Sequence, residues 1–134
     1  MDRISTRRRS ANMRAIRSTG MKPEILVRKI VHKLGHRFRL HRRDLPGKPD
    51  LVFGPKRKVI FVHGCFWHQH SNCIDGRVPK SNLGYWKAKL ARNIERDAEN
   101  INALKLSGWQ PLVIWECETK NITKVSTRIK RFLR

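Results

Sequence analysis

Apolar residues recur every three or four positions in three stretches of the chain, which is the spacing of an amphipathic helix. The first stretch begins at Pro23, whose fixed φ suits a first helical turn, has the acid Glu24 beside it, and ends before Gly35. The second covers residues 85–106, and Asn121 is a suitable cap for the third. The apolar residues predicted to face the core are Leu26, Ile30, Leu34, Leu90, Ile94, Ile101, Leu104, Val125, Ile129 and Phe132.

Four shorter stretches have the alternating or continuous apolar pattern of β-strands, at residues 38–40, 50–53, 58–63 and 111–115. Turns that contain proline and glycine separate the second strand from its neighbours. The order helix, three strands, helix, strand, helix predicts an α/β domain with a mixed sheet and helices on its faces. Residues 64–84 show no period, and a loop of this length needs something to organise it.

The first twenty residues are basic and contain few sizeable apolar side chains, so they cannot bury much surface. We therefore expect residues 1–20 to form a basic arm that binds phosphates, and residues 21–134 to form a single domain. Met13 and Ile16 lie three positions apart and would share one face if the arm became helical. The alternative is a solvated arm whose apolar residues are incidental.

Positive charge is spread over the whole chain of 134 residues. Thirty-one Lys and Arg residues against ten Asp and Glu residues give a formal net charge of +21. Such a chain favours a polyanionic partner, and nucleic acid is the default. An anionic membrane surface and ribosomal-type RNA binding are the alternatives. No apolar run approaches the roughly 18–20 residues that span a bilayer, so we expect a cytoplasmic, nucleoid-associated protein.

The three cysteines of the chain suggest a metal site rather than a disulfide framework, because their number is odd. Cys65, His70 and Cys73 lie in the loop after the third strand, and Cys117 follows the fourth strand. Together they would make a closed Cys3His zinc site, which is a structural geometry with no open position for substrate. The alternative is three unrelated buried thiols.

A second candidate site combines Asp50, at the start of a strand, with Val62, twelve positions later on the next strand. In metal-dependent nucleases an acid in this place binds magnesium, since hard cations take oxygen ligands. The usual acid-x-Lys partner is missing, but the Val62 carbonyl can still bind a cation. His68 could replace the missing lysine as the group that handles the proton of the attacking water. The alternative is that Asp50 has only a structural role and caps the turn that precedes the strand.

Phe66 and Trp67 stand between the predicted zinc ligand Cys65 and His68. If the loop is held rigid at both sides, the two rings would point outward and could wedge between base steps. The alternative is that they belong to the core.

Several motifs closely resemble the very-short-patch repair endonucleases, a family of DNA mismatch nucleases. They are G-K-P-D at 47–50, V-I-F-V-H-G-C-F-W-H-Q-H at 59–70, Y-W-K-A-K-L-x-x-N-I-E-R-D at 85–97 and V-I-W-E-C at 113–117. The resemblance begins at the N-M-R-A-I segment, 12–16, and so extends over nearly the whole chain. It implies a restriction-endonuclease-like fold with a structural zinc, and an enzyme that nicks duplex DNA beside the T of a T:G mismatch left by deamination of 5-methylcytosine.

The resemblance also implies a role for individual residues. Asp50 and the Val62 carbonyl would bind Mg²⁺, and His68 would be the general base or acid, with His63 and Glu24 supporting the water and the phosphate. The zinc ligands would be Cys65, His70, Cys73 and Cys117. The residues that contact DNA would be the aromatic wedge and the mismatch readers on one helix, together with the arm in the minor groove: Phe66, Trp67, Trp86, Lys89, Asn93, Met13 and Ile16.

Two positions depart from the family pattern. Val62 stands where the family often has threonine, which is harmless if the backbone carbonyl is the ligand. The spacing between His70 and Cys73 can differ by one residue, which a flexible loop should absorb. We expect a monomer that acts on mismatched double-stranded DNA, with other mismatch-repair proteins as candidate partners. The alternative functions are a non-catalytic zinc-stabilised nucleic-acid-binding protein and a nuclease without mismatch preference.

Overall fold

A computed structural model describes residues 22–70 and 78–134 of the chain. The helices and strands lie close to the predicted ranges, and a 3-10 helix that the periodicity did not indicate follows the last strand. In chain order the elements are α2 (Pro23–Lys33), β1 (Arg39–Leu40), β2 (Leu51–Phe53), β3 (Lys58–His63), α3 (Leu83–Leu106), β4 (Gln110–Trp115), η2 (Glu116–Lys120) and α4 (Ile122–Phe132).

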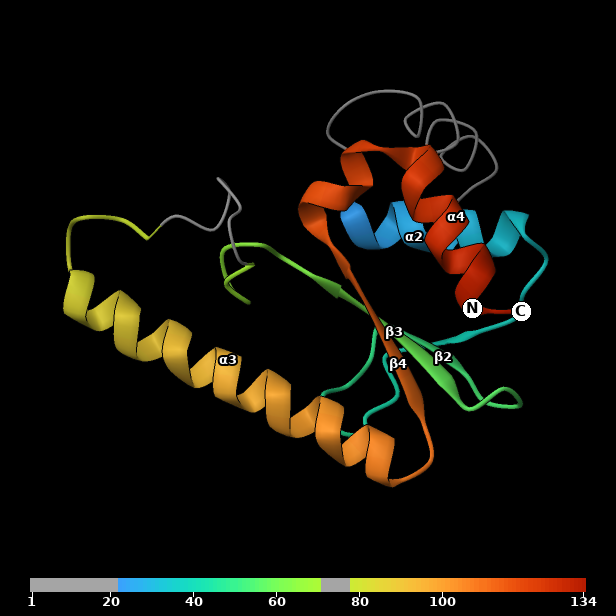
Figure 1. Cartoon of the computed structure of the whole chain (residues 1–134), viewed down its shortest axis with the longest axis horizontal. Coiled ribbons are helices and arrows are strands. Elements are labelled where there is room, and N and C mark those ends of the chain that lie inside the picture. Colours follow the sequence, from blue (N-terminus) through green and yellow to red (C-terminus); the bar gives the residue numbers. More distant parts are fainter. Residues whose placement is uncertain (1–21, 71–77) are drawn as a thin grey trace, which may run out of the picture.

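The four strands form one mixed sheet in the order β1-β2-β3-β4, which confirms the predicted fold class. The pairs β1–β2 and β2–β3 are antiparallel, and β3–β4 is parallel. Helices α2 and α4 cover one face of the sheet, and α3 crosses the other face (Figure 1). This arrangement fits the restriction-endonuclease-like fold that the sequence resemblance implied.

The two faces of the sheet build separate cores. Under α2 and α4 the sheet contributes Leu51, Phe53, Ile60 and Ile114. Under α3 it contributes Val52, Val59 and Phe61, which pack with Leu104 of the helix. Successive residues of β2 therefore point into opposite cores, and all three are buried, as expected for a strand covered on both faces.

The parallel pairing of β3 with β4 brings the carboxyl ends of both strands to one edge of the sheet. In the register His63 lies opposite Trp115, so a continuation by two residues would place Cys65 opposite Cys117. Because β2 runs antiparallel to β3, its amino end, beginning at Leu51, reaches the same edge. Residues that stand far apart in the sequence thus meet at one edge of the sheet.

Two of the predicted core positions are wrong. Leu34 caps the end of α2 and Ile94 lies on α3, yet these side chains are 36% and 47% exposed. Helix α3 has 24 residues, a length of roughly 36 Å, whereas a six-residue strand spans roughly 20 Å. The amino-terminal half of α3 therefore extends beyond the sheet, as Figure 1 shows, which leaves part of the apolar face of this helix exposed.

The loop before β2 approaches α3 closely, and Gly47 makes this approach possible. Gly47 has φ +77°, and a Cβ there would lie 3.0 Å from the Cβ of Asn100 and 3.1 Å from the Phe61 ring. The turn is thereby pressed between the helix and the sheet, and this packing fixes the chain three residues before Asp50.

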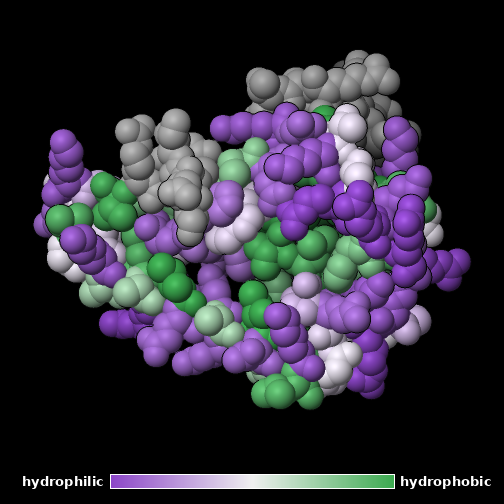
Figure 2. Space-filling view, viewed as in Figure 1, coloured by the Kyte–Doolittle hydropathy of each residue, from purple (hydrophilic) through white to green (hydrophobic). Residues whose placement is uncertain are grey.

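Hydrophilic side chains cover much of the face seen in Figure 2, and hydrophobic ones emerge along α3 and between the layers. Within residues 22–70 and 78–134, no helix combines the length and the apolar content needed to cross a bilayer.

Candidate active site and metal centre

Asp50 is fixed at the sheet edge by a hydrogen bond from a neighbouring strand. The backbone N–H of Val62 donates to Asp50 Oδ2 at 2.6 Å. The carboxylate thus takes the place of the backbone carbonyl that would accept this N–H if the antiparallel pairing continued. The register Leu51↔Ile60 places position 49 opposite Val62, and Pro49 has no N–H to donate. The Val62 carbonyl faces the same side as its N–H, so it receives no ladder bond from position 49 and lies beside the carboxylate.

His68 belongs to a group of three polar side chains on the other side of this edge. Its Nδ1 lies 2.5 Å from Asp97 Oδ2 of α3, and its ring stacks on His63 with centroids 3.8 Å apart. The ring is positioned by a turn in which the His68 N–H donates to the Gly64 carbonyl. Asp97 therefore orients the imidazole through its Nδ1.

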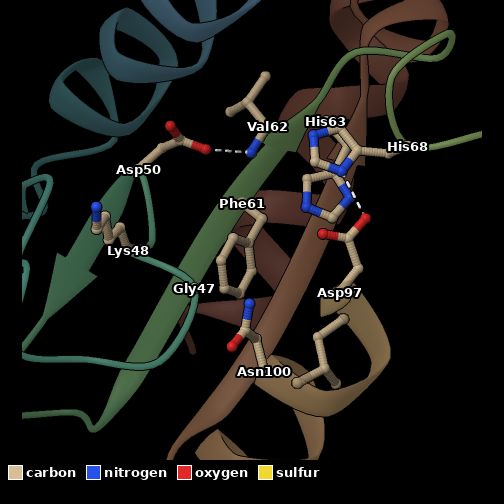
Figure 3. A pocket seen from close by; sticks show the side chains of 10 residues that line it. Gly47, Lys48, Asp50, Phe61, Val62, His63, His68, Asp97 and Asn100 are labelled. Carbon is tan, nitrogen blue, oxygen red and sulfur yellow. Dashed lines mark hydrogen bonds and ion pairs between the residues drawn. The ribbon is translucent and has the colours of Figure 1, made fainter. Parts of the chain in front are cut away.

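A cavity of about 160 Å³ separates the two groups. Asp50 and Val62 line one side, and His63, His68 and Asp97 line the other, as Figure 3 shows. The arrangement places carboxylate and carbonyl oxygens that could hold a cation, and an imidazole oriented by a carboxylate, around a single space. Metal-assisted hydrolysis uses groups of these kinds.

Glu24 reaches the Asp50 side of the site from the first turn of α2. Its Oε1 lies 3.0 Å from His41 Nε2, and its Oε2 accepts a hydrogen bond from Arg28 at 2.7 Å. The other ring nitrogen of His41, Nδ1, lies 3.9 Å from Asp50 Oδ1. Glu24, His41 and Asp50 thus form one group that could hold a metal ion.

Burial raises the pKa of Asp50 to about 6, against the Val62 hydrogen bond, which lowers it. The neighbouring Glu24 raises this pKa further, because two negatively charged carboxylates so close together repel each other and so favour the protonated form of Asp50. Burial, with a contribution from His68, lowers the pKa of His63 to about 4. His63 is therefore neutral at physiological pH.

The predicted zinc ligands Cys65, His70 and Cys117 lie together. Their ligand atoms are all within 4.8 Å of one another, with Cys65 Sγ and Cys117 Sγ at 3.8 and 3.3 Å from His70 Nδ1. Neighbouring ligands around tetrahedral zinc are about 3.5–4 Å apart. The set of soft donors therefore fits zinc. Cys73 lies outside the described residues.

The predicted DNA-contacting residues of the loop and of α3 also form a cluster. The rings of Phe66, Trp67 and Trp86 lie 5.1 to 5.9 Å apart, and Trp67 is 47% exposed. Lys89 Nζ lies 5.4 Å from the centre of the Trp67 ring, and Asn93 Nδ2 donates to the Trp67 carbonyl at 3.2 Å. Trp67 is thus exposed, as expected of a ring that points outward, whereas Phe66 is half-buried against Trp67 and Trp86. Met13 and Ile16 lie outside the described residues.

The sequence analysis missed two residues of the site. Asp97 ends the helical motif that carried the family resemblance, but nothing local distinguishes it from the other acids of the chain. His41 follows β1 and has φ +51°, and its own N–H donates to the Asp50 carbonyl at 3.3 Å. Its only sequence signal is a histidine directly after a predicted strand.

Comparison with known proteins supports the resemblance to the very-short-patch repair endonucleases. The profile of a family described as DNA mismatch endonuclease Vsr matches residues 1–74. The chain is 46% identical to Type II nicking enzyme V.XorIIP of Xanthomonas oryzae, over 98% of this chain and 96% of that protein. The chain belongs to the Vsr family of DNA mismatch endonucleases.

Two further relatives extend the comparison. Type II nicking enzyme V.NmeAIP of Neisseria meningitidis is 42% identical, over 99% of this chain and 94% of its own length. The DNA mismatch endonuclease Vsr of Escherichia coli is 39% identical, over 88% of this chain and 75% of its own length. The chain is accordingly a DNA endonuclease, a hydrolase of phosphodiester bonds.

The raised pKa of Asp50 predicts a gain of stability in Asp50→Asn when no divalent cation is present. A folded-state pKa of about 6 above an ordinary 3.8 means that folding favours the protonated carboxyl. The contribution of Asp50 to the free energy of unfolding is therefore fully present below pH 3.8 and is lost as the pH rises to about 6. An asparagine stays neutral and can still accept the Val62 hydrogen bond, so the variant should be more stable above pH 6, by at most about 3 kcal/mol.

Chemical unfolding of both proteins between pH 4 and pH 7.5 measures this difference. His63 titrates over an overlapping range, but it is present in both proteins and cancels in the comparison. The gain should shrink to nothing near pH 4. A constant difference across the range would contradict the assignment of the raised pKa to Asp50.

Proposed function

We propose that this protein is a magnesium-dependent endonuclease that nicks duplex DNA beside the T of a T:G mismatch and so starts very-short-patch repair. The observation that carries the proposal is that Asp50 and the His68–Asp97 pair line one cavity at the sheet edge. The mismatch endonuclease and the nicking enzymes among the relatives of the chain support this choice of substrate and reaction.

Asp50 Oδ1 and the Val62 carbonyl are the oxygens that would hold Mg²⁺. A bound magnesium ion would neutralise charge on the scissile phosphate and lower the pKa of a coordinated water. Asp50 Oδ2 stays engaged with the Val62 N–H, so the carboxylate is held in one orientation. Glu24, on the same side, supports the position of the water and the phosphate.

His68 acts as the general base. Its Nε2 takes the proton of the attacking water as the new P–O bond forms and the bond to the leaving sugar oxygen breaks. Asp97 accepts the Nδ1 hydrogen bond, which selects this tautomer and stabilises the imidazolium that results. Neutral His63 supports the ring from below by stacking.

The acids of the cavity argue against a non-catalytic nucleic-acid binder. Asp50, Glu24 and Asp97 gather around the space that a phosphate would enter, and each would repel it. A protein that only bound DNA would gain affinity by losing them. The acids are useful only if a cation or a proton transfer is involved.

Replacement of the two principal groups should have different effects on rate and on affinity. His68→Ala should reduce the nicking rate on a T:G duplex by roughly 10²–10⁴, the usual contribution of a general acid or base. Asp50→Ala should abolish nicking and preserve or improve DNA affinity, because it removes negative charge near a phosphate. For both variants the rate is measured by single-turnover nicking with Mg²⁺, and the affinity by duplex binding without Mg²⁺.

The control is His32→Ala, since His32 is an exposed histidine at the end of α2, outside the cavity. Its rate should match that of the parent. If His68→Ala nicks at the parental rate, His68 is not the base.

In this proposal the aromatic cluster recognises the mismatch. A T:G pair keeps two hydrogen bonds but stacks less well than a Watson–Crick pair, so wedging rings into that step costs less energy. Phe66, Trp67 and Trp86 would form the wedge, and Lys89 and Asn93 would read the exposed base edges. Met13 and Ile16, on the basic arm, would approach from the minor groove.

Trp67→Ala should reduce nicking at T:G far more than it reduces binding to matched duplex, which is mainly electrostatic. The assay compares the nicking rate on a panel of mismatched duplexes with the affinity for the matched one. Leu106→Ala, at the far end of α3 and 88% exposed, is the control and should change neither. Equal losses of nicking and binding in Trp67→Ala would mean that the ring is only structural.

A structural zinc would be held by Cys65, His70 and Cys117 with Cys73 as the fourth ligand. Such an ion would tie the loop after β3 to the end of β4, because the ligands come from both. The loop carries His68, Phe66 and Trp67, so the zinc would hold the general base and the wedge in place. The residues hold the ion, and the ion takes no part in the reaction.

Elemental analysis of the purified protein should find one zinc per chain. Cys117→Ser should lower the melting temperature and the zinc content together, because metal affinity contributes to folding. A zinc-free protein whose stability is indifferent to strong chelators would contradict this site.

A further inference from the structure

A histidine that the proposed mechanism does not use lies against its metal site. His41 stands between the two carboxylates, with Nε2 3.0 Å from Glu24 Oε1 and Nδ1 3.9 Å from Asp50 Oδ1. Each of the three residues offers a ligand atom within 4.8 Å of those of the others. The three come from different elements, because Glu24 is on α2, His41 follows β1 and Asp50 precedes β2.

These separations match a coordination sphere. Ligands about 2.1 Å from a small divalent cation lie about 3 Å apart when adjacent and about 4.2 Å apart when opposite. The Glu24–His41 distance corresponds to adjacent ligands, and the His41–Asp50 distance falls between the two values. A cation could thus replace the proton that the histidine and Glu24 now share, without a large rearrangement.

The backbone directs His41 into this position. Its N–H donates to the Asp50 carbonyl at 3.3 Å, which prolongs the pairing of β1 with β2 by one residue. The residue adopts φ +51°, a conformation that a histidine seldom takes. The side chain remains half exposed, at 50%, so an ion from solvent can reach it.

Arg28 completes the surroundings of the site without occupying it. Its Nη2 binds Glu24 Oε2 at 2.7 Å and lies 3.4 Å from His41 Nε2. The guanidinium holds Glu24 by one oxygen and leaves Oε1 directed at the histidine.

We propose that His41 is a ligand of the catalytic metal, so that Asp50, Glu24 and His41 hold the ion with one nitrogen among its oxygens. The inference rests on the proposed function and deepens it. Its consequence is metal preference, because imidazole suits transition metals whereas carboxylate and carbonyl oxygens suit magnesium and manganese alike. The site should therefore bind Mn²⁺ more tightly than Mg²⁺ by a wider margin than oxygen ligands alone would give.

The test uses the full-length protein without DNA, with one equivalent of zinc present so that the cysteine site does not take up manganese. Mn²⁺ binding is followed by the loss of the free-ion electron paramagnetic resonance signal, and Mg²⁺ binding by competition. Pulsed resonance on bound Mn²⁺ reports a coordinated ¹⁴N directly. The variants are His41→Gln and Asp50→Asn, and the control is His32→Gln, an exposed histidine away from the cavity.

His41→Gln should lower the affinity for Mn²⁺ roughly tenfold or more, lower that for Mg²⁺ much less, and remove the ¹⁴N signal. His32→Gln should change none of these. If the ¹⁴N signal persists in His41→Gln, or if both affinities keep their ratio, His41 is only an ion-pair partner of Glu24 and the inference fails. If Asp50→Asn leaves binding of both metals intact, the proposed catalytic metal site itself fails.

Discussion

The parallel pairing of β3 with β4 is the interaction on which the site depends. It brings the loop that follows β3 beside the residues that follow β4, so that Cys65 and His70 of the loop lie close to Cys117. The antiparallel neighbour β2 delivers Asp50 to the same edge. Asp50, Cys65, Phe66, Trp67 and His68 therefore stand beside strand ends or in the turn after β3, while Glu24 on α2 and Trp86 on α3 reach the same region from the helices.

Helix α3 contributes residues to both the aromatic cluster and the cavity, and these residues lie along one of its faces. Trp86, Asn93, Asp97 and Asn100 follow one another at intervals of seven, four and three residues, which keeps them on one side of a helix. The first two contact the aromatic cluster, Asp97 contacts His68, and Asn100 packs near Gly47. The aromatic cluster and the His68–Asp97 pair are thus held at a fixed separation by one helix.

Local patterns were sufficient to predict the helices and strands, and the family resemblance supplied the roles proposed for the site residues. Helical and alternating periods depend only on near neighbours, so α2, β3 and α4 fell close to their predicted ranges. The errors at Leu34 and Ile94 arose because a period shows which face is apolar and not how far the sheet extends beneath it. Asp97 and His41 could not be predicted, since their roles come from contacts 29 and 17 residues away in the chain.

The electrostatics of the site explain why its parts depend on one another. Asp50 and Glu24 stand together in a chain of net charge +21, and burial raises the pKa of Asp50 although cations surround it at longer range. An approaching phosphate adds a further negative charge to the same small space. Distant lysines and arginines in water cannot relieve that repulsion, because solvent and salt screen them. A cation bound between the carboxylates can, so metal binding and DNA docking should reinforce each other.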